Sequence, residues 1–360
     1  MKRYCLVSFC NIYVLPYAKI YIDAIKNAGA ECDLLYWDRD AVNGQNDSFL
    51  CNKICYQRKM TPESSVGDKV FGYIQARNFF VKRLKENNYD GIVFLQTHAA
   101  IACGRMLSQK YVGRYIVDIR DYTLEKYTLY KKLEKRVIDN AFATVISSPA
   151  YSYFLPKHDY VVAHNYSPFS ESMITEVREN TVDRVGGPIQ ISFVGTVRFI
   201  DMDKRILRLF ANDERFKINY FGSGSDVLER FCKKNSIHNV EFFGSFSPAM
   251  TVSFYKKTDI INNLYGNHNP FLDYALSNKL YHSGQLYLPI LVCPDTYMEQ
   301  VTKKYNMGFV FDIESENSVE ELYNWFYTID RCALKKGCNS FINKVKEDNE
   351  RFNEMVKRFF

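Results

Sequence analysis

The stretch that decides the fold is IQISFVGTVRFIDMDKRILRLF, at residues 189–210. It starts with a short apolar run, breaks at Gly195, and continues into a segment whose apolar residues recur at helical spacing. A strand, a glycine turn and a helix in this order form the first part of a βαβ unit. The same succession repeats before and after the stretch, so the sequence predicts an α/β protein with parallel sheets covered by helices.

Short apolar runs are predicted as strands on both sides of a composition change at residues 167–188. The runs before it are at residues 4–9, 32–36, 91–96, 114–118, 143–147 and 160–163, and those after it at 189–194, 217–221, 240–243, 259–264, 288–293 and 308–311. Residues 68–87 and 123–139 have the periodicity of crossover helices. Residues 38–67 have little periodicity and are predicted to form a long loop.

Length and composition divide the chain into two predicted domains. Its 360 residues exceed the size at which a single core keeps growing. Gly186, Gly187 and Pro188 end a charged segment that fits neither pattern. The predicted parts are an N-terminal Rossmann-like domain at 1–170, a linker at 171–188, a C-terminal Rossmann-like domain at 189–338, and a helix at 339–360 that packs back on the first domain.

Composition excludes several classes of protein. Hydrophobic residues make up 47% of the chain and charged residues 24%, which is globular rather than disordered usage. The net charge of +6 suits phosphate-bearing ligands or an anionic membrane surface, but no concentrated basic stripe indicates nucleic acid. No apolar run approaches the roughly 18 residues of a membrane span. The ten Cys lack zinc-site spacing and suit a reducing compartment. From the cysteines we expect a cytoplasmic protein, and from the charge pattern we expect no nucleic-acid partner.

Loops that follow strand ends are the candidate binding site, because ligands of open α/β sheets bind beyond the carboxyl ends of the strands. Gly195 ends one strand, and backbone can approach a phosphate there. Arg198 and Lys204 follow it as a candidate diphosphate clamp. Surface cations on a solvated helix are the alternative interpretation of these two residues.

Two further glycines end predicted strands. Gly222 opens a Gly-x-Gly turn, but Val227 stands where a dinucleotide fingerprint needs its third glycine. A dehydrogenase would need that fingerprint and an acidic ribose ligand, and neither is present. Gly244 ends the next strand, where backbone amides are suited to the edge of a nucleotide base.

Four motifs in the second half occur in the order and at the spacing of a known family. They are FVG at 193–195, GSG at 222–224, VEFFG at 240–244, and NKLY at 278–281 followed by PILV at 289–292. With these motifs the sequence resembles glycosyltransferase family 4 and its relatives in capsule and exopolysaccharide synthesis. The resemblance covers residues 189–312 and reaches the first half only through its architecture and short echoes.

The resemblance implies a fold and an activity. The fold is GT-B, in which two Rossmann-like parallel-sheet domains face a central cleft. The activity is transfer of a sugar from a nucleotide-diphosphate sugar to a saccharide or lipid-linked saccharide acceptor in bacterial surface polysaccharide synthesis. Such a reaction would be metal-independent and retaining, with the nucleotide sugar as co-substrate and no further cofactor. The lipid-linked acceptor would bring the protein into peripheral contact with the cytoplasmic face of the inner membrane.

The candidate donor-binding residues lie on and around these motifs. They are Gly195, Arg198, Lys204, Gly222, Gly244, His268, Asn278, Lys279 and His282. Many relatives have a ribose-binding Glu where this chain has His282, and Tyr274 stands where the paired Glu is expected. A His still donates or accepts a ribose hydrogen bond. Two alternatives therefore stay open, a nucleotide-sugar epimerase and a non-catalytic GT-B subunit of a polysaccharide assembly complex.

Three residues of the first half are candidate catalytic residues because they follow predicted strands: His98, Arg120 and Asp121. An isolated His is more often structural, and Asp121 can instead cap the next helix. Asp-x-Asp occurs at 38–40 and 201–203 and matches the metal-binding element of another glycosyltransferase fold. The second copy precedes a helix that it would cap, and the predicted architecture differs from that fold, so we predict no metal site.

Overall fold

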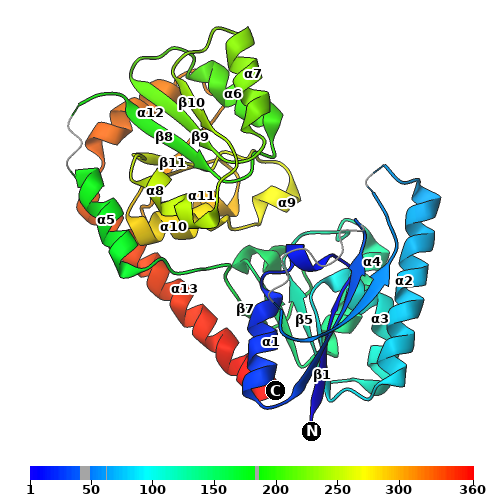
Figure 1. Ribbon diagram of the computed structural model, residues 1–360. Helices are drawn as coiled ribbons and strands as arrows, with labels where there is room; N and C mark the ends of the chain where they lie inside the picture. Colours follow the sequence, from blue (N-terminus) through cyan, green and yellow to red (C-terminus); the bar gives the residue numbers. More distant parts are fainter. Residues whose placement is uncertain (41–48, 62, 183–185) are drawn as a thin grey trace. The chain divides into compact units, whose positions relative to one another are not determined.

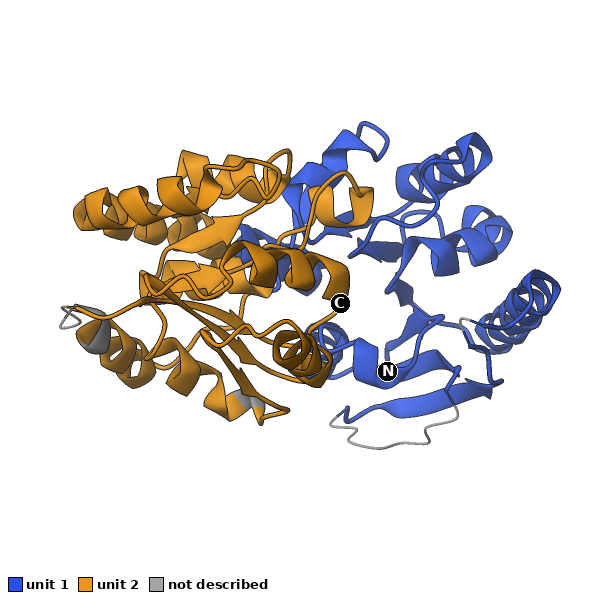
Figure 2. Cartoon of the chain, turned by 90° about the horizontal axis from the view of Figure 1, so that it is seen from above, with its two compact units in different colours: residues 1–165, 347–360 blue, residues 166–346 orange. Residues whose placement is uncertain are grey.

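The computed structural model describes residues 1–40, 49–61, 63–182 and 186–360. These residues form two compact units, which are coloured separately in Figure 2. Unit 1 consists of Met1–Asn165 and Glu347–Phe360, and unit 2 of Tyr166–Lys346. The chain therefore leaves unit 1 once and returns to it at its C-terminal end.

Unit 1 is built on a parallel sheet that follows from the apolar runs of the first half (Figure 1). Its seven described strands are β1 (Arg3–Ser8), β2 (Glu31–Asp38), β3 (Asn52–Gln57), β4 (Gly91–Phe94), β5 (Tyr115–Ile119), β6 (Ala143–Ile146) and β7 (Tyr160–Val162). They pair in the order β3-β2-β1-β4-β5-β6-β7. β1 and β4 are buried along nearly their whole length, which explains their continuous apolar runs.

Strand β3 shows that the prediction of a loop throughout residues 38–67 was wrong. It is an edge strand that runs parallel to β2, with Ile54 opposite Leu35. Its side chains are exposed or half-buried, so no buried face imposes an apolar alternation on this part of the sequence. Residues 41–48 and 62 of the predicted loop lie outside the described residues.

Helices cover both faces of the unit 1 sheet. On one face lie α2 (Val66–Glu86), α3 (Thr97–Lys110) and α4 (Thr128–Asp139), and on the other lie α1 (Ala18–Asn27) and the last turns of α13 (Arg331–Phe359) (Figure 1). Two 3-10 turns, η1 (Ile12–Val14) and η2 (Pro149–Tyr153), follow β1 and β6. Right-handed crossovers explain the arrangement, because the chain crosses the sheet in one direction from β1 to β3 and in the other from β3 to β7.

Unit 2 repeats the design with a smaller sheet. Its six described strands are β8 (Ile189–Val194), β9 (Phe216–Phe221), β10 (Val240–Phe243), β11 (Ile260–Asn262), β12 (Ile290–Val292) and β13 (Gly308–Val310). They pair in the order β10-β9-β8-β11-β12-β13. The direction of travel across the sheet reverses after β10, so the neighbours β8 and β11 form the topological switch point, where open sheets bind ligands.

The helices of unit 2 fill the intervals between its strands. They are α5 (Glu171–Val182), α6 (Ile200–Leu209), α7 (Ser225–Lys234), α8 (Thr251–Tyr255), α9 (Pro270–Asp273), α10 (Asn278–Leu286), α11 (Tyr297–Lys304) and α12 (Ser318–Thr328), with a 3-10 turn η3 (Pro248–Met250). Helix α5 occupies most of the segment expected as a linker, because Ile174 and Val177 are buried in the unit 2 core. Residues 183–185 of that segment lie outside the described residues.

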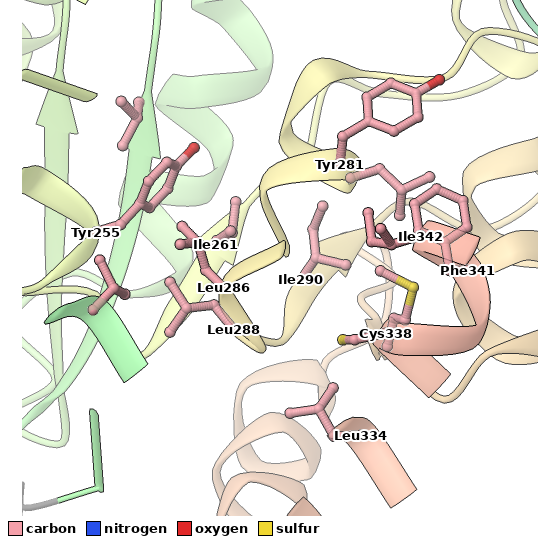
Figure 3. Packing of buried hydrophobic residues seen from close by; sticks show 14 of the residues in the cluster. Tyr255, Ile261, Tyr281, Leu286, Leu288, Ile290, Leu334, Cys338, Phe341 and Ile342 are labelled. Atoms are coloured by element: carbon pink, nitrogen blue, oxygen red, sulfur yellow. The ribbon is translucent and has the colours of Figure 1, made fainter. Parts of the chain in front are cut away.

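The first half of α13 closes a hydrophobic core of unit 2 (Figure 3). The ring of Phe341 stacks on Tyr281 with centroids 5.8 Å apart. Gly284 on α10 permits this approach, because a Cβ there would lie 2.9 Å from Cδ1 of Ile342. The last part of the same helix belongs to unit 1, where Phe352 and Val356 are buried in a hydrophobic core. Helix α13 therefore contributes to the cores of both units.

Candidate functional site

The loops that follow β8 and β9 are joined by a close backbone contact. The amide of Gly195 donates to the carbonyl of Phe221 at 2.8 Å, and the amide of Gly222 donates to Phe243 at 2.8 Å. A Cβ on Gly222 would lie 1.8 Å from the carbonyl oxygen of Gly195, so only glycine fits at this position. The predicted strand-end glycines therefore shape one edge, although a Cβ on Gly244 would meet open space.

Lys279 lies beneath this edge and is almost fully buried. Its Nζ donates to the hydroxyl of Tyr265 at 2.5 Å and lies 4.0 Å from the centroid of the Phe193 ring. A Cβ on Gly195 would be 3.7 Å from this ammonium. No carboxylate among the described residues forms an ion pair with Lys279, so a fixed positive charge stands at the switch point.

Asp203 is a buried carboxyl near Lys279 that the sequence had suggested as a helix cap. Helix α6 begins at Ile200, so Asp203 lies inside its first turn and does not cap it. Burial raises its pKa to about 6, against the opposing effects of a 3.0 Å hydrogen bond from Tyr220 and of Lys279. Asp201, the other member of the Asp-x-Asp element, is exposed and lies 3.7 Å from Lys204. The two carboxylates therefore have different environments and do not make a paired site.

Arg198 and Lys204, the predicted clamp, have different surroundings. Arg198 is exposed and makes no hydrogen bond or ion pair within the described ranges. Lys204 contacts Asp201 and faces the ring of Phe231 on α7 at 5.9 Å. The structure thus leaves Arg198 available to an anion near Gly195, while the contacts of Lys204 are with its own helix and with α7.

His282 lies on α10, three residues beyond Lys279. The hydroxyl of Tyr255 contacts its Nδ1 at 2.9 Å, and the ring of Phe169 lies against it at 4.9 Å. Burial, and to a smaller extent Lys279, lowers the pKa of His282 to about 4. The imidazole is therefore neutral near pH 7, and its Nε2 makes no hydrogen bond to any described residue.

The two remaining donor candidates are at the surface. Asn278 is the exposed first residue of α10, and Ser277 caps that helix by accepting from the amide of Lys279 at 3.3 Å. His268 has a left-handed backbone (φ 57°) and lies 3.9 Å from Asp295. Asn263 was not predicted as a site residue. Its side-chain Oδ1 is buried and accepts no hydrogen bond from any described residue.

In unit 1 the candidate Arg120 is held by the fold itself. Its Nε and Nη2 donate to the two oxygens of the buried Asp118 at 2.6 and 2.8 Å, and its Nη1 donates to the carbonyl of Ala163 and to Asn165. The guanidinium also stacks over the ring of Tyr17 at 4.6 Å. Asp121, the next residue, is exposed.

His98 is the second residue of α3 and lies within an aromatic cluster. Its ring lies 5.7 Å from Phe9 and 6.2 Å from Tyr73. Burial, and then Arg39, lowers the pKa of His98 to about 4, so this imidazole is neutral as well. Its Nε2 is buried and accepts or donates no hydrogen bond within the described part of the chain.

A cavity of about 420 Å³ opens beside this cluster at the carboxyl edge of the unit 1 sheet. Loops after β1 and β2 line it with Asn11, Tyr13, Arg39 and Asp40, and α2 adds Tyr73. The hydroxyl of Tyr13 donates to Asp40, and the guanidinium of Arg39 stacks over the Tyr73 ring at 5.2 Å. Aromatic faces beside hydrogen-bonding groups suit a ligand that has both apolar faces and hydroxyls.

Comparisons with solved structures match the whole chain. Sucrose-phosphate synthase from Thermosynechococcus elongatus matches with a TM-score of 0.65 and 11% identity, over 100% of this chain and 95% of that chain. Anabaena HepE in complex with UDP matches with a TM-score of 0.68 and 12% identity, over 99% and 100%. This chain has the GT-B fold. A glycosyltransferase from Rickettsia africae matches it with a TM-score of 0.66 and 12% identity, over 99% and 98%.

No protein-family model and no curated protein sequence matched this GT-B chain. Across residues 1–40, 49–61, 63–182 and 186–360, no group of three or more His, Cys, Asp and Glu side chains is placed to hold a metal ion. No helix in those ranges has the length and apolar character needed to cross a membrane.

Proposed function

We propose that this protein is a glycosyltransferase that moves a sugar from a nucleotide-diphosphate sugar to a saccharide or lipid-linked saccharide acceptor. The observation that carries the proposal is Arg198, an exposed cation without a partner among the described residues, close to the glycine edge at the switch point of unit 2. Likeness over the whole chain to glycosyltransferases, and to a protein solved with UDP, supports it.

The donor diphosphate binds at the loops that follow β8 and β9. Gly195 and Gly222 have no side chains there, so a phosphate can approach their backbone. Arg198 supplies a planar fork that matches phosphate oxygens. Lys279 adds a positive charge that is already oriented before the ligand arrives, and such preorganised charge stabilises a leaving diphosphate.

The neutral His282 contacts an uncharged part of the donor. With Nδ1 engaged by Tyr255, its Nε2 is the atom left to hydrogen bond a ribose or sugar hydroxyl. A neutral imidazole can serve either as donor or as acceptor, so this position keeps the hydrogen-bonding ability that a Glu provides in the resembling family.

The acceptor binds in the cavity of unit 1. Tyr13 and Tyr73 offer aromatic faces to a sugar ring, and Arg39 and Asp40 offer hydrogen bonds to hydroxyls. His98 packs behind Tyr73 and holds that ring in place. Asp121 at the same sheet edge is the remaining proposed catalytic residue of this unit.

Four finer features complete the proposal. We propose that catalysis needs no metal, because Arg198 and Lys279 supply the positive charge that a divalent cation supplies elsewhere. We also propose retention of anomeric configuration and a role in bacterial surface polysaccharide synthesis, both by the motif resemblance at 193–195 and 278–281. The place of action is the cytoplasm.

The thermal shift of the protein with UDP, UDP-glucose and other nucleotide sugars tests the proposal. The rate at which the nucleotide is released from the donor, measured with and without EDTA, then tests whether a metal is needed. We expect a shift with at least one nucleotide, and about tenfold to hundredfold weaker binding in Arg198→Ala, because a charged hydrogen bond contributes roughly 1.5–3 kcal/mol. Arg230→Ala on α7 removes an exposed arginine of the same unit and should bind normally. No response to any nucleotide would overturn the proposal.

A further inference from the structure

No basic stripe is apparent along the linear sequence, but the fold brings positive charge together on the three helices that cover one face of the unit 1 sheet. Helices α2, α3 and α4 together hold eleven Lys and Arg side chains against four Asp and Glu side chains, a formal charge of +7. The whole chain carries +6, so all other residues together come to −1. The positive charge of this protein is therefore a property of this helical layer.

A groove between α2 and α3 collects part of that charge. It has a volume of about 690 Å³, and Arg77, Lys82, Lys85 and Arg105 lie along it. Glu86 is the one acidic lining residue, and it lies 3.8 Å from Lys82 and 3.3 Å from Arg83. The groove thus keeps an excess of cations that described carboxylates do not neutralise.

Aliphatic side chains in the N-terminal halves of α2 and α4 are exposed to solvent. Val66, Val70 and Ile74 on α2, and Leu129 and Leu133 on α4, are between 41% and 78% exposed. In each helix they recur every four residues, so they form a stripe along one side. Exposed apolar side chains that lie next to one another mark interaction surfaces, whereas single scattered ones are common on any protein.

The stripe on α2 lies near the candidate acceptor cavity. A helix that follows a parallel strand begins at the carboxyl edge of the sheet, which is the edge where the cavity opens. Helix α2 serves both features, because Tyr73 lines the cavity while the neighbouring Ile74 faces solvent.

We propose that the α2–α4 face docks on an anionic lipid bilayer. Its Lys and Arg side chains contact lipid headgroups, and the aliphatic stripes of α2 and α4 enter the interface. This inference rests on the proposed function, because docking would deliver a lipid-linked acceptor beside the cavity. Nucleic acid would use the same charge but would not need the aliphatic side chains, so the combination favours lipid.

Sedimentation of the full chain with vesicles tests the surface. We expect binding to phosphatidylcholine vesicles that contain phosphatidylglycerol, weak binding to phosphatidylcholine alone, and loss of binding as salt rises. Lys85→Glu with Arg105→Glu should weaken binding by about tenfold or more. Lys234→Glu with Lys336→Glu makes the same change of net charge in unit 2, where both side chains are exposed, and should change it little.

A second variant separates lipid from nucleic acid. Val70→Ser with Ile74→Ser should weaken vesicle binding severalfold while leaving the affinity for a DNA oligonucleotide unchanged. Equal binding to both kinds of vesicle, equal loss in both charge variants, or oligonucleotide binding without vesicle binding would each overturn the docking surface. A UDP thermal shift without vesicle binding would refute only this surface, whereas vesicle binding without any nucleotide response would refute only the proposed function.

Discussion

Arg120 in unit 1 and Arg198 in unit 2 follow buried parallel strands at the same edge of their sheets, yet their environments are opposite. The side chain of Arg120 is 7% exposed and joined by two bonds to Asp118. Arg198 is exposed and meets no partner among the described residues. The cause is the strand, because β5 contains the fully buried Asp118 and β8 contains no carboxylate. A strand-end arginine is thus structural in one sheet and available to a ligand in the other.

The largest difference in stability that tests this comparison is expected from substitution of Arg120. Arg120→Ala leaves the charge of Asp118 buried without its cation, and should lower the free energy of unfolding by about 3–5 kcal/mol. Arg198→Ala should stay within roughly 0.5 kcal/mol of the parent, as other exposed substitutions do. Denaturant unfolding of both variants measures the difference, and equal stabilities would remove the distinction between the two arginines.

The glycine edge of unit 2 gives the next largest effect. Gly222→Ala puts a Cβ 1.8 Å from the carbonyl oxygen of Gly195 at φ 150°, so overpacking and backbone strain should cost about 3 kcal/mol together. Gly29→Ala in unit 1 has φ 68° and open space around its Cβ, and should cost only about 1 kcal/mol. Thermal unfolding compares the two, and a similar cost for both would mean that the backbone contact is not tight.

Buried carboxyls also distinguish the units, because burial and then Glu125 raise the pKa of Glu134 to about 8, whereas that of Asp203 is raised only to about 6. Between pH 4.5 and 8 Glu134 keeps its proton in the folded protein and loses it in the unfolded chain. The free energy of unfolding therefore decreases as pH rises through this range. Glu134→Gln should therefore stabilise the protein by about 2–3 kcal/mol at pH 7 and by little at pH 4.5. An equal gain at both pH values in chemical denaturation would contradict this cause.

The smallest expected effect comes from a feature that both units share, a neutral buried histidine. His98 and His282 each have a pKa lowered to about 4 in the folded state. Below pH 6.5 the unfolded state therefore binds more protons than the folded state, and the free energy of unfolding decreases as the pH is lowered. His282→Gln should reduce the loss between pH 7 and 5 by about 1–2 kcal/mol. Unfolding curves at both pH values check this, with His98→Gln as the matched variant in unit 1.

Much of the fold could be predicted from local sequence. The apolar runs predicted every described strand except β3, and the motifs at 193–195, 222–224 and 240–244 placed the loops that follow β8, β9 and β10. Each of these signals depends on residues that are neighbours in the chain. Strand β3 was missed because an edge strand with no fully buried face need not show an apolar pattern.

The candidate site was predicted less completely, because a side chain's role depends on its partners. Gly195, Gly222 and Lys279 were predicted as site residues, and the structure brings them together. Lys279 was expected to line the donor side, and only the structure shows it buried against Phe193 and Tyr265. Phe193 occurs in a quoted motif and Tyr265 does not, and nothing in the spacing assigns either ring to a lysine.

The sequence by itself therefore determined two parallel α/β sheets and the strand-end positions from which ligands are bound, since hydrophobic periodicity and glycine turns act over a few residues. Tertiary structure alone decided that Arg120 pairs with Asp118 while Arg198 has no partner among the described residues, and that α13 supplies side chains to the core of each unit. Those outcomes depend on which distant residues meet, because an ion pair or a packed core forms from groups that the chain brings together only on folding.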